Sequence, residues 1–462
     1  AIRQHLPDGR TMWGYGGDCG DEYNFGVFGC NGLCCADRTP HPALLQVKKS
    51  YQPVSIELLD ADGVRLAVRN QHAFVSLAAL QGRWRLTVDG VTVCHGELAR
   101  LNLAPGETAE VVITLDSADT RVGERHLLVE FAQTADTAWA PAGYVVAWEQ
   151  FALPPQPAKT AVDVEALPPV AMSQDRRWLT LDFDEGKACI DKETGELVSF
   201  CARGRELLTA PLTMNLTRAP VDNDVSLAAM MPALKFAVHD PWPRAWARRQ
   251  LRALSIARHD DAAVRVQAQI VLPLARRPLV LTYTLFGTGD LVIDAELTPC
   301  RELLRMGVQF HTSAEYERVT WYGRGPHETM WDRKTGAAVG IYSLSVEDMV
   351  ERYVRPQESG NRSDVRWATL TDNDGEGWLI VDEAGTGLDV SAWPFTQDDL
   401  MGAMHYHELP RRDKITVNVG YRQRGVGGDV PVGVTVHDAY RLKGNRTYRL
   451  CFRLRPYSPG DP

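Results

Sequence analysis

The chain has 462 residues, 44% hydrophobic and 24% charged, which is the composition of a globular protein large enough for several hydrophobic cores. Its formal net charge is −9 and it has no long basic run, so the charge pattern argues against a nucleic-acid binder. No apolar run reaches membrane-spanning length. The first residues, AIRQHLPDGR, have no initiator Met and no signal-peptide pattern, so we expect a cut made inside a longer chain.

Nine cysteines are scattered along the chain, and the odd number argues against a disulfide framework. Free thiols are typical of a reducing compartment, which predicts a cytoplasmic protein. Four cysteines fall between positions 19 and 35, but Cys34 and Cys35 are adjacent and no CxxC pair is present. The pattern therefore favours small packing residues over a zinc site.

The first 48 residues are rich in glycine, cysteine and aromatic residues, which indicates a tight loop whose backbone can approach a ligand closely. A short helix is predicted from His41, because Pro42 suits a helix start and Leu44, Leu45 and Val47 form one apolar face. From about residue 49 the apolar period becomes two, with Asp-Gly turn signals at 62–63 and 89–90. Strands at this spacing up to residue 153 predict an immunoglobulin-like sandwich.

Residues 154–172 are rich in proline and alanine, which predicts a stiff, extended linker. Residues 173–462 again read as strands, and no long helical period interrupts them. Nearly 290 residues of this kind predict one large antiparallel double-sheet domain. The predicted fold class is therefore mostly β.

Three blocks of this sequence resemble the bacterial β-galactosidases of glycoside hydrolase family two. They are YGGDCGDEYNFGVFGCNGL with ADRTPHPAL (15–44), LTRAPVDNDV (216–225), and YGRGPHETMWDRKTGAAVGIY (322–342) with RYVRPQESGNRSDVRW (352–367). The resemblance implies the C-terminal portion of such an enzyme. Residues 1–48 would close the catalytic (β/α)8 barrel, 49–153 would form the immunoglobulin-like sandwich, and 173–462 the small-chain β-sandwich with a galactose-mutarotase-like fold.

Retaining glycosidases need two carboxyl groups about 5 Å apart. In the family both are glutamates on barrel strands that precede the first block, so we expect this chain to hold neither and to be inactive alone. Glu22-Tyr23 looks like the family's nucleophile pair, but it lies in the glycine-rich loop instead of at a strand end. No catalytic residue is therefore predicted here.

The resemblance implies that the Asn31 side chain and the Phe28 carbonyl bind Na⁺ beside the galactose, with the Phe28 ring next to the sugar. Hard cations take such oxygens, and glycine-rich turns expose carbonyls. From the residues alone, an Asn-Gly turn with a core phenylalanine remains the alternative. Asn24 matches a position near a Mg²⁺ ion, and its alternative is a turn asparagine. Asp18 and Asp21 are expected to hold the loop by hydrogen bonds to its amides.

Val432 stands where the family has a tryptophan that stacks on the second sugar, and an isopropyl group is a poor substitute for a ring. It is therefore a substrate-binding candidate that puts lactose affinity in doubt. His405 and His407 could hold a metal if they lay on a strand, but the family has a similar pair without one. Trp393 and Phe395 are predicted to be core residues.

The leading hypothesis is a retaining β-galactosidase fragment or subunit that acts on terminal β-galactosides such as lactose. Its expected partners are the substrate, the missing N-terminal catalytic part and further subunits in a homo- or hetero-oligomer, with neither nucleic acid nor membrane. One alternative is a non-catalytic carbohydrate-binding or assembly module. Another is an active mutarotase, for which the sequence offers no evident acid–base pair.

Overall fold

The computed structural model describes residues 1–462 except 31, 116–121, 157–166, 225–239, 430–435 and 462, and for Phe28 it describes the backbone only. Two compact units are present. Unit 1 comprises Ala1–Pro42, Asp163–Lys334 and Tyr342–Pro462, and unit 2 comprises Ala43–Val162 and Thr335–Ile341. The glycine-rich N-terminal segment thus belongs to the same unit as the large C-terminal sheets. Among the described residues, no helix is long and apolar enough to cross a membrane.

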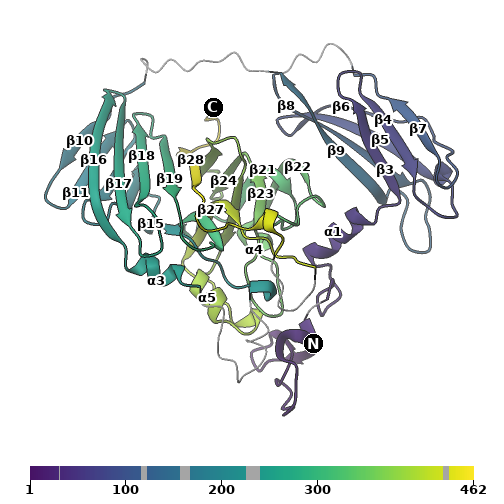
Figure 1. Ribbon diagram of the computed structural model, residues 1–462, viewed down its shortest axis with the longest axis horizontal. Coiled ribbons are helices and arrows are strands. Elements are labelled where there is room, and N and C mark those ends of the chain that lie inside the picture. Colours follow the sequence, from purple (N-terminus) through teal and green to yellow (C-terminus); the bar gives the residue numbers. More distant parts are fainter. Residues whose placement is uncertain (31, 116–121, 157–166, 225–239, 430–435, 462) are drawn as a thin grey trace. The chain divides into compact units, whose positions relative to one another are not determined.

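Unit 2 is a two-sheet sandwich of the size and strand pattern of an immunoglobulin-like domain (Figure 1). One sheet has the order β3-β4-β7 and the other β6-β5-β8-β9, all antiparallel. The strands are β3 (Val54–Asp60), β4 (Arg65–Asn70), β5 (Leu80–Val88), β6 (Val91–Glu97), β7 (Thr108–Val112), β8 (Gly123–Gln133) and β9 (Val145–Gln156). Val54, Leu66 and Leu127 are fully buried between the sheets. For Val54 and Leu66 the alternation along β3 and β4 predicts this burial.

The two Asp-Gly signals of this domain form different turns. Asp89 and Gly90 connect β5 to β6 with φ of 47° and 79°, which is the left-handed pair that a two-residue hairpin turn requires. In the β3–β4 hairpin the left-handed residue is Val64, with φ of 42°, and the ladder shifts register between Leu58 and Asp60. The hairpin was predicted, but its loop is longer than the Asp-Gly pair.

The helix predicted from His41 is present as α1 (Pro42–Ser50), with proline in its first turn. Its Gln46 side chain donates to Thr335 Oγ1 (2.7 Å) and accepts from the Gly336 amide (2.9 Å). Gln150 of β9 exchanges two hydrogen bonds with the backbone of Val339. These contacts attach Thr335–Ile341, a piece of the third sequence block, to unit 2.

Unit 1 contains three larger antiparallel sheets, ordered β10-β11-β12-β13-β14, β15-β20-β27-β26-β23 and β16-β17-β18-β19-β28-β25-β24-β21-β22. The first has β10 (Ala171–Gln174), β11 (Trp178–Phe183), β12 (Gly186–Asp191), β13 (Leu197–Ala202) and β14 (Arg205–Glu206). The second has β15 (Ala210–Asn215), β20 (Arg305–Ser313), β23 (Arg362–Val365), β26 (Leu388–Trp393) and β27 (Lys414–Gln423). The third has β16 (Gln250–Asp260), β17 (Ala263–Val271), β18 (Leu279–Phe286), β19 (Leu291–Leu297), β21 (Arg318–Gly325), β22 (Ala338–Ser345), β24 (Trp367–Thr371), β25 (Gly377–Asp382) and β28 (Tyr448–Tyr457).

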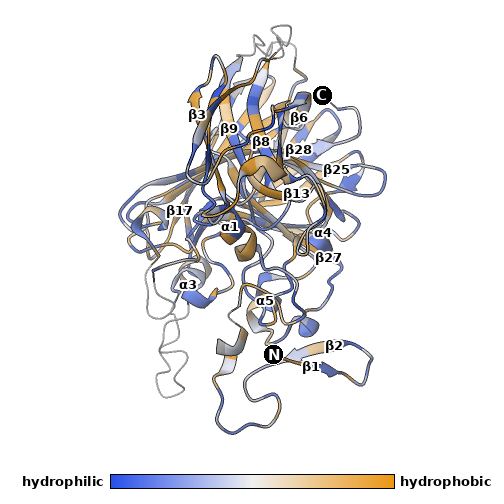
Figure 2. Ribbon diagram, turned by 90° about the vertical axis from the view of Figure 1, so that its right-hand side faces the viewer, coloured by the Kyte–Doolittle hydropathy of each residue, from blue (hydrophilic) through white to orange (hydrophobic). Residues whose placement is uncertain are grey.

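One hydrophobic core runs through these sheets, and it includes the fully buried Tyr283, Phe310 and Trp378. Apolar and polar residues alternate along the strands in Figure 2, since a strand directs successive side chains to opposite faces. The described helices are short: α3 (Trp242–Ala247), α4 (Val346–Met349) and α5 (Gln397–Gly402), with 3-10 turns η4 (Asp222–Asp224), η5 (Tyr406–Glu408) and η6 (Asp438–Tyr440). The predicted mostly β fold with two sandwiches is confirmed.

The N-terminal segment forms a small hairpin, β1 (Ile2–His5) with β2 (Thr11–Gly14), followed by the glycine-rich loop and η1 (Gly26–Cys30). It lies beside α5 in unit 1 (Figure 1). In the small-chain sheets, Gly325 has no room for a side chain, since a Cβ there would come within 2.7 Å of the Tyr342 ring and 2.9 Å of Trp321. The YGRGP motif (322–326) therefore serves close packing.

Candidate functional site

The described part of the glycine-rich loop, residues 15–30, is held by its own acidic and amide side chains. Asp18 Oδ2 accepts from the backbone N–H of Tyr15 (2.7 Å), and Asp21 Oδ2 accepts from that of Gly17 (3.2 Å). Asn24 Oδ1 accepts from the Gly26 amide (3.0 Å) and its Nδ2 donates to the Asp21 carbonyl (3.1 Å). The predicted role of Asp18 and Asp21 as the loop's framework is confirmed.

The proposed cation ligands fall in and around this loop. Phe28 is part of η1, whereas Asn31 lies outside the described residues. Asn24 is exposed, and since its Oδ1 accepts a single hydrogen bond, one lone pair stays available for a hard cation. No cluster of three or more His, Cys, Asp or Glu side chains able to hold a metal occurs in the described part of the chain. The Na⁺ and Mg²⁺ sites thus remain predictions.

Beside the loop, His41 bonds the segment next to Asn31. Its Nδ1 lies 2.9 Å from the Gly32 carbonyl oxygen, and its ring meets the edge of the Tyr353 ring at 5.4 Å between centroids. Tyr353 in turn donates its hydroxyl to Glu328 Oε1 (2.8 Å), in the third sequence block. The first and third blocks of the sequence are therefore in direct contact.

The loop also docks on the segment between α5 and β27. The Tyr15 hydroxyl donates to the Met404 carbonyl (2.6 Å), and the Arg10 guanidinium donates to the His407 carbonyl. Asp18 Oδ2 lies 2.7 Å from His405 Nε2. His405 and His407 are at a 3-10 turn and not on a strand, and both nitrogens of His405 face carboxylates.

Charged residues of the second block form a buried network. Arg218 and Asp224, whose side chains are both fully buried, pair at 2.8 Å, and Arg424 joins the same carboxylate at 2.8 Å. Burial alone would raise the pKa of Asp224, but the two guanidinium groups outweigh it and lower the pKa. The LTRAPVDND motif thus contributes a buried ion pair, Arg218–Asp224, and through Arg424 this pair connects η4 with the end of β27.

The third block continues this network. Glu328 is ion-paired with Arg333 and accepts the Gly360 amide (2.7 Å), so its carboxylate joins two segments of the block. Burial and the nearby Glu328 carboxylate raise the pKa of Glu351 to about 7.

Glu358 of the same block pairs with Arg305 of β20 and accepts from Gln423 of β27 (3.1 Å), and all three side chains are buried. Burial raises the pKa of Glu358 in spite of Arg305. These charged residues are therefore in the interior, where Glu358 holds its loop to β20 and β27.

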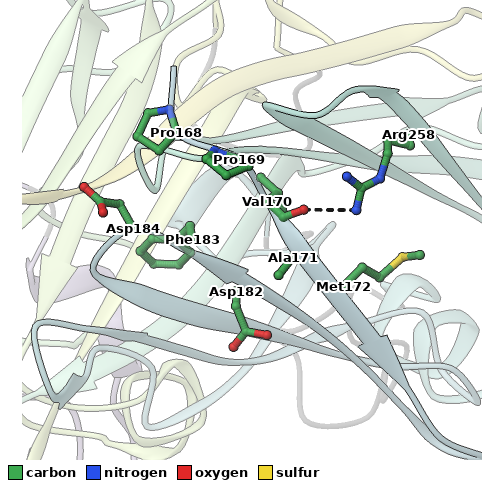
Figure 3. A pocket seen from close by; sticks show the side chains of 9 residues that line it. All are labelled: Pro168, Pro169, Val170, Ala171, Met172, Asp182, Phe183, Asp184 and Arg258. Carbon is green, nitrogen blue, oxygen red and sulfur yellow. Dashed lines mark hydrogen bonds between the residues drawn. The ribbon is translucent and has the colours of Figure 1, made fainter. Parts of the chain in front are cut away.

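A pocket of about 630 Å³ opens where β10 and β11 meet β16 (Figure 3). Its wall contains two exposed carboxylates, Asp182 and Asp184, on either side of Phe183, and Figure 3 shows them pointing in different directions. Arg258 is bonded to the Val170 carbonyl (3.1 Å). A glycosidase pair has to converge on one bond, so this pocket does not supply one.

The remaining candidate residues lie in a small core, in the exposed loop or outside the described residues. Trp393 and Phe395 are 0% and 2% exposed in a small separate core, as predicted. Glu22 and Tyr23 are exposed in the loop, with Tyr23 91% exposed. Val432 lies outside the described residues, so its place near a substrate remains a prediction.

Comparison with known families identifies the parts in order along the chain. A model described as beta-galactosidase small chain matches residues 184–454, one described as beta-galactosidase domain 4 matches 66–154, and one described as the TIM barrel domain of glycosyl hydrolases family 2 matches 1–56. The chain belongs to the β-galactosidase small-chain family. It corresponds to the C-terminal portion of family two enzymes, as the three sequence blocks imply.

Curated relatives extend this similarity over nearly the whole chain. A β-galactosidase of Priestia megaterium (strain DSM 319 / IMG 1521) is 36% identical over 99% of this chain, and the β-galactosidase BgaC of Bifidobacterium adolescentis is 31% identical over 98%. These alignments cover 44% and 43% of the two relatives, so the chain spans less than half their length. Among solved structures, galactose 1-epimerase from Lactobacillus acidophilus aligns with 63% of this chain and 99% of its own at 9% identity, with a TM-score of 0.38.

Two features of this region were not predicted from the sequence. The first is the buried network of Arg218, Arg305 and Glu358, although paired charges within short motifs were a visible signal. The second is the contact of Asp18 with His405, which are 387 positions apart. No local sequence pattern predicts a contact between residues so far apart in the chain.

Proposed function

We propose that this chain supplies the glycine-rich substrate loop, the immunoglobulin-like domain and the small-chain sandwich of a retaining β-galactosidase that acts on terminal β-galactosides such as lactose. The observation that carries the proposal is the ordered match of barrel end, domain 4 and small chain, together with relatives named β-galactosidase over 99% of the chain. The two carboxylates of the double displacement would come from a catalytic part that this chain does not contain.

In this proposal the galactoside binds against the loop. The Asn31 amide oxygen and the Phe28 carbonyl would hold a Na⁺ ion, and Asn24 would lie near Mg²⁺. Such ions supply a fixed positive charge that orients sugar hydroxyls. Val432 would stand beside the second sugar. Assembly into a homo- or hetero-oligomer and a cytoplasmic location belong to the same proposal.

A chimaera tests the proposal directly. The part of the Priestia megaterium relative that does not align with this chain is joined to Ala1, and hydrolysis of a nitrophenyl β-galactoside is measured for the chimaera and for the chain alone. We expect turnover by the chimaera and none by the chain, since only the chimaera holds the carboxylate pair. Turnover by the chain well above a mock purification would contradict the proposal. Saturable galactoside binding with an inactive chimaera would favour the carbohydrate-binding module.

The cation assignment is tested in the same chimaera. Removing a neutral oxygen ligand leaves the ion under-coordinated, so Asn31→Ala should raise the Na⁺ concentration needed for half-maximal affinity. Equal Na⁺ dependence of the parent chimaera and of Asn31→Ala would remove Asn31 from the site.

A further inference from the structure

His405 joins the small-chain segment to the glycine-rich loop through two carboxylates. Its Nε2 lies 2.7 Å from Asp18 Oδ2, on the loop, and its Nδ1 lies 3.0 Å from Glu408 Oε1, on its own 3-10 turn. The His405 side chain is 12% exposed, and those of Asp18 and Glu408 are 22% and 40% exposed. The histidine is thus held from its own side by Glu408 and directed at Asp18.

The two contacts indicate the protonation state of the His405 ring. A neutral imidazole has one N–H and one lone pair, so one of its nitrogens would face a carboxylate without a proton between them. Only the imidazolium donates from both nitrogens. The geometry therefore matches a cation placed between two anions, and hydrogen bonds of this charged kind are about twice as strong as neutral ones.

Asp18 connects His405 to the start of the glycine-rich loop. The same oxygen that faces His405 also accepts the Tyr15 amide (2.7 Å), at the point where the loop begins. The Tyr15 ring lies 5.0 Å from the His405 ring, and the Tyr15 hydroxyl donates to Met404 O (2.6 Å). Tyr15 is 8% exposed, so the loop's first residue is packed against the segment that His405 starts.

The remaining charged and titratable neighbours are few among the described residues. His407 lies 5.5 Å from His405 between ring centroids, and Arg10, which pairs with Asp8, donates to the His407 carbonyl. Arg355 is near the Tyr15 hydroxyl. Asp18 and Glu408 are thus the anions within hydrogen-bond distance of the ring.

We propose that His405 is a positioning residue for the galactoside site: as an imidazolium anchored by Glu408, it fixes Asp18 and with it the glycine-rich loop, residues 15–30. The small-chain sandwich thereby sets the geometry of a loop whose first residue, Tyr15, precedes His405 by 390 positions. The consequence for galactoside affinity rests on the proposed function, whereas the effect on the loop does not.

Hydrogen exchange of the whole chain measures the loop without any ligand. His405→Gln keeps a polar side chain but removes the charge, and Asp18→Asn removes the charge from the other partner. We expect exchange in residues 15–30 to become about tenfold faster in each variant, because a charge-assisted bond is lost. The double variant should exchange no faster than the faster single one, since both substitutions break the same contact.

His437→Gln is the matched control, because His437 also pairs with a carboxylate, Asp429, at 2.8 Å, and both side chains are exposed. Exchange in β27, the central strand of its sheet, reports whether a variant keeps its fold. Unchanged loop exchange in both single variants, or effects that add fully in the double variant, would overturn the proposal.

The chimaera separates this proposal from the proposed function. There His405→Gln should raise KM for a nitrophenyl galactoside several-fold while kcat changes little, since the loop binds and does not react. If the loop exchanges faster and KM does not move, His405 positions the loop but the loop is not the galactoside site. If the loop does not respond, the positioning role itself is wrong.

Discussion

A histidine between two carboxylates keeps its proton to a higher pH than a free one. Burial alone would lower the pKa of His405, but hydrogen bonds to Asp18 and Glu408 outweigh burial and raise the pKa above its ordinary value of 6.5. Burial would likewise raise the pKa of Asp18, and the bonds from His405 and the Tyr15 amide lower it below 3.8 instead. The contact thus stabilises the docked loop from above pH 3.8 up to 6.5, and loses strength as the pH rises through the raised pKa of His405 or falls through the lowered pKa of Asp18.

This shift predicts an NMR titration. Asp18→Asn should bring the pKa of His405 back toward 6.5, because the anion that favours the charged ring is removed. The imidazole resonances of His405 across pH 5–9 measure it, with Asp429→Asn as the control that should leave His405 unchanged. A His405 that titrates equally in wild type and Asp18→Asn would show that the pair does not form in solution.

Buried charges predict a large stability effect at a second residue. Asp224→Ala leaves Arg218 fully buried without its carboxylate, and breaking such a pair costs about 3–5 kcal/mol. Urea unfolding of the whole chain measures the loss of unfolding free energy. Glu317→Ala is the control, because the Arg411–Glu317 pair is 55% and 56% exposed and is expected to contribute at most about 1 kcal/mol. Equal losses in the two variants would contradict the structural role of the second block.

At the scale of elements, most of the architecture follows from local patterns. The alternation of β3 and β4 predicts their strand conformation and their buried faces, and Pro42 predicts the start of α1. The conformations of the loops are predicted less well by local sequence patterns. Both Asp-Gly pairs predict hairpins, yet only Asp89-Gly90 is left-handed; in the β3–β4 hairpin, whose ladder shifts register, that conformation falls on Val64.

The two turns make a matched test. Gly90→Ala places a Cβ on a residue with φ of 79° and should lower the unfolding free energy of the immunoglobulin-like domain by about 1–2 kcal/mol. Gly63→Ala should change it by less than about 0.5 kcal/mol, since a Cβ there meets only the mobile end of Asp60 (2.9 Å). Thermal unfolding of both variants measures these two changes in unfolding free energy. A larger loss from Gly63→Ala would mean that the left-handed residue is misplaced.

At the scale of the whole molecule, the proposed galactoside site draws on distant parts of the polypeptide. The loop of the first block is fixed by the small-chain segment, while the proposed chemistry needs a barrel whose family model matches only residues 1–56 here. In the proposed function, catalysis is therefore a property of the assembled enzyme, and substrate specificity is measured in the chimaera.

Val432 provides the specificity prediction. In the chimaera, Val432→Trp should tighten disaccharide binding more than binding of simple aryl galactosides, because an indole offers a flat face to the second sugar. Aromatic contacts of this kind contribute about 0.5–1.5 kcal/mol, or roughly a few-fold to tenfold in affinity. Aryl substrates carry their own ring and gain less. KM and inhibition constants for lactose and a nitrophenyl galactoside measure the difference, and equal effects on both would remove Val432 from the site.

The sequence by itself determined the strands, the two sandwiches, the helix after the loop and the family, because alternation, turn residues and three ordered blocks are local properties of the chain. It also predicted that Asp18 and Asp21 hold the glycine-rich loop, since short acidic side chains bond nearby amides. Only the tertiary structure decided what Asp18 faces on its other side, and that Arg218, Arg305 and Glu358 are interior. Those contacts join residues far apart in the chain, and burial is set by how sheets pack together, which no short window of sequence contains.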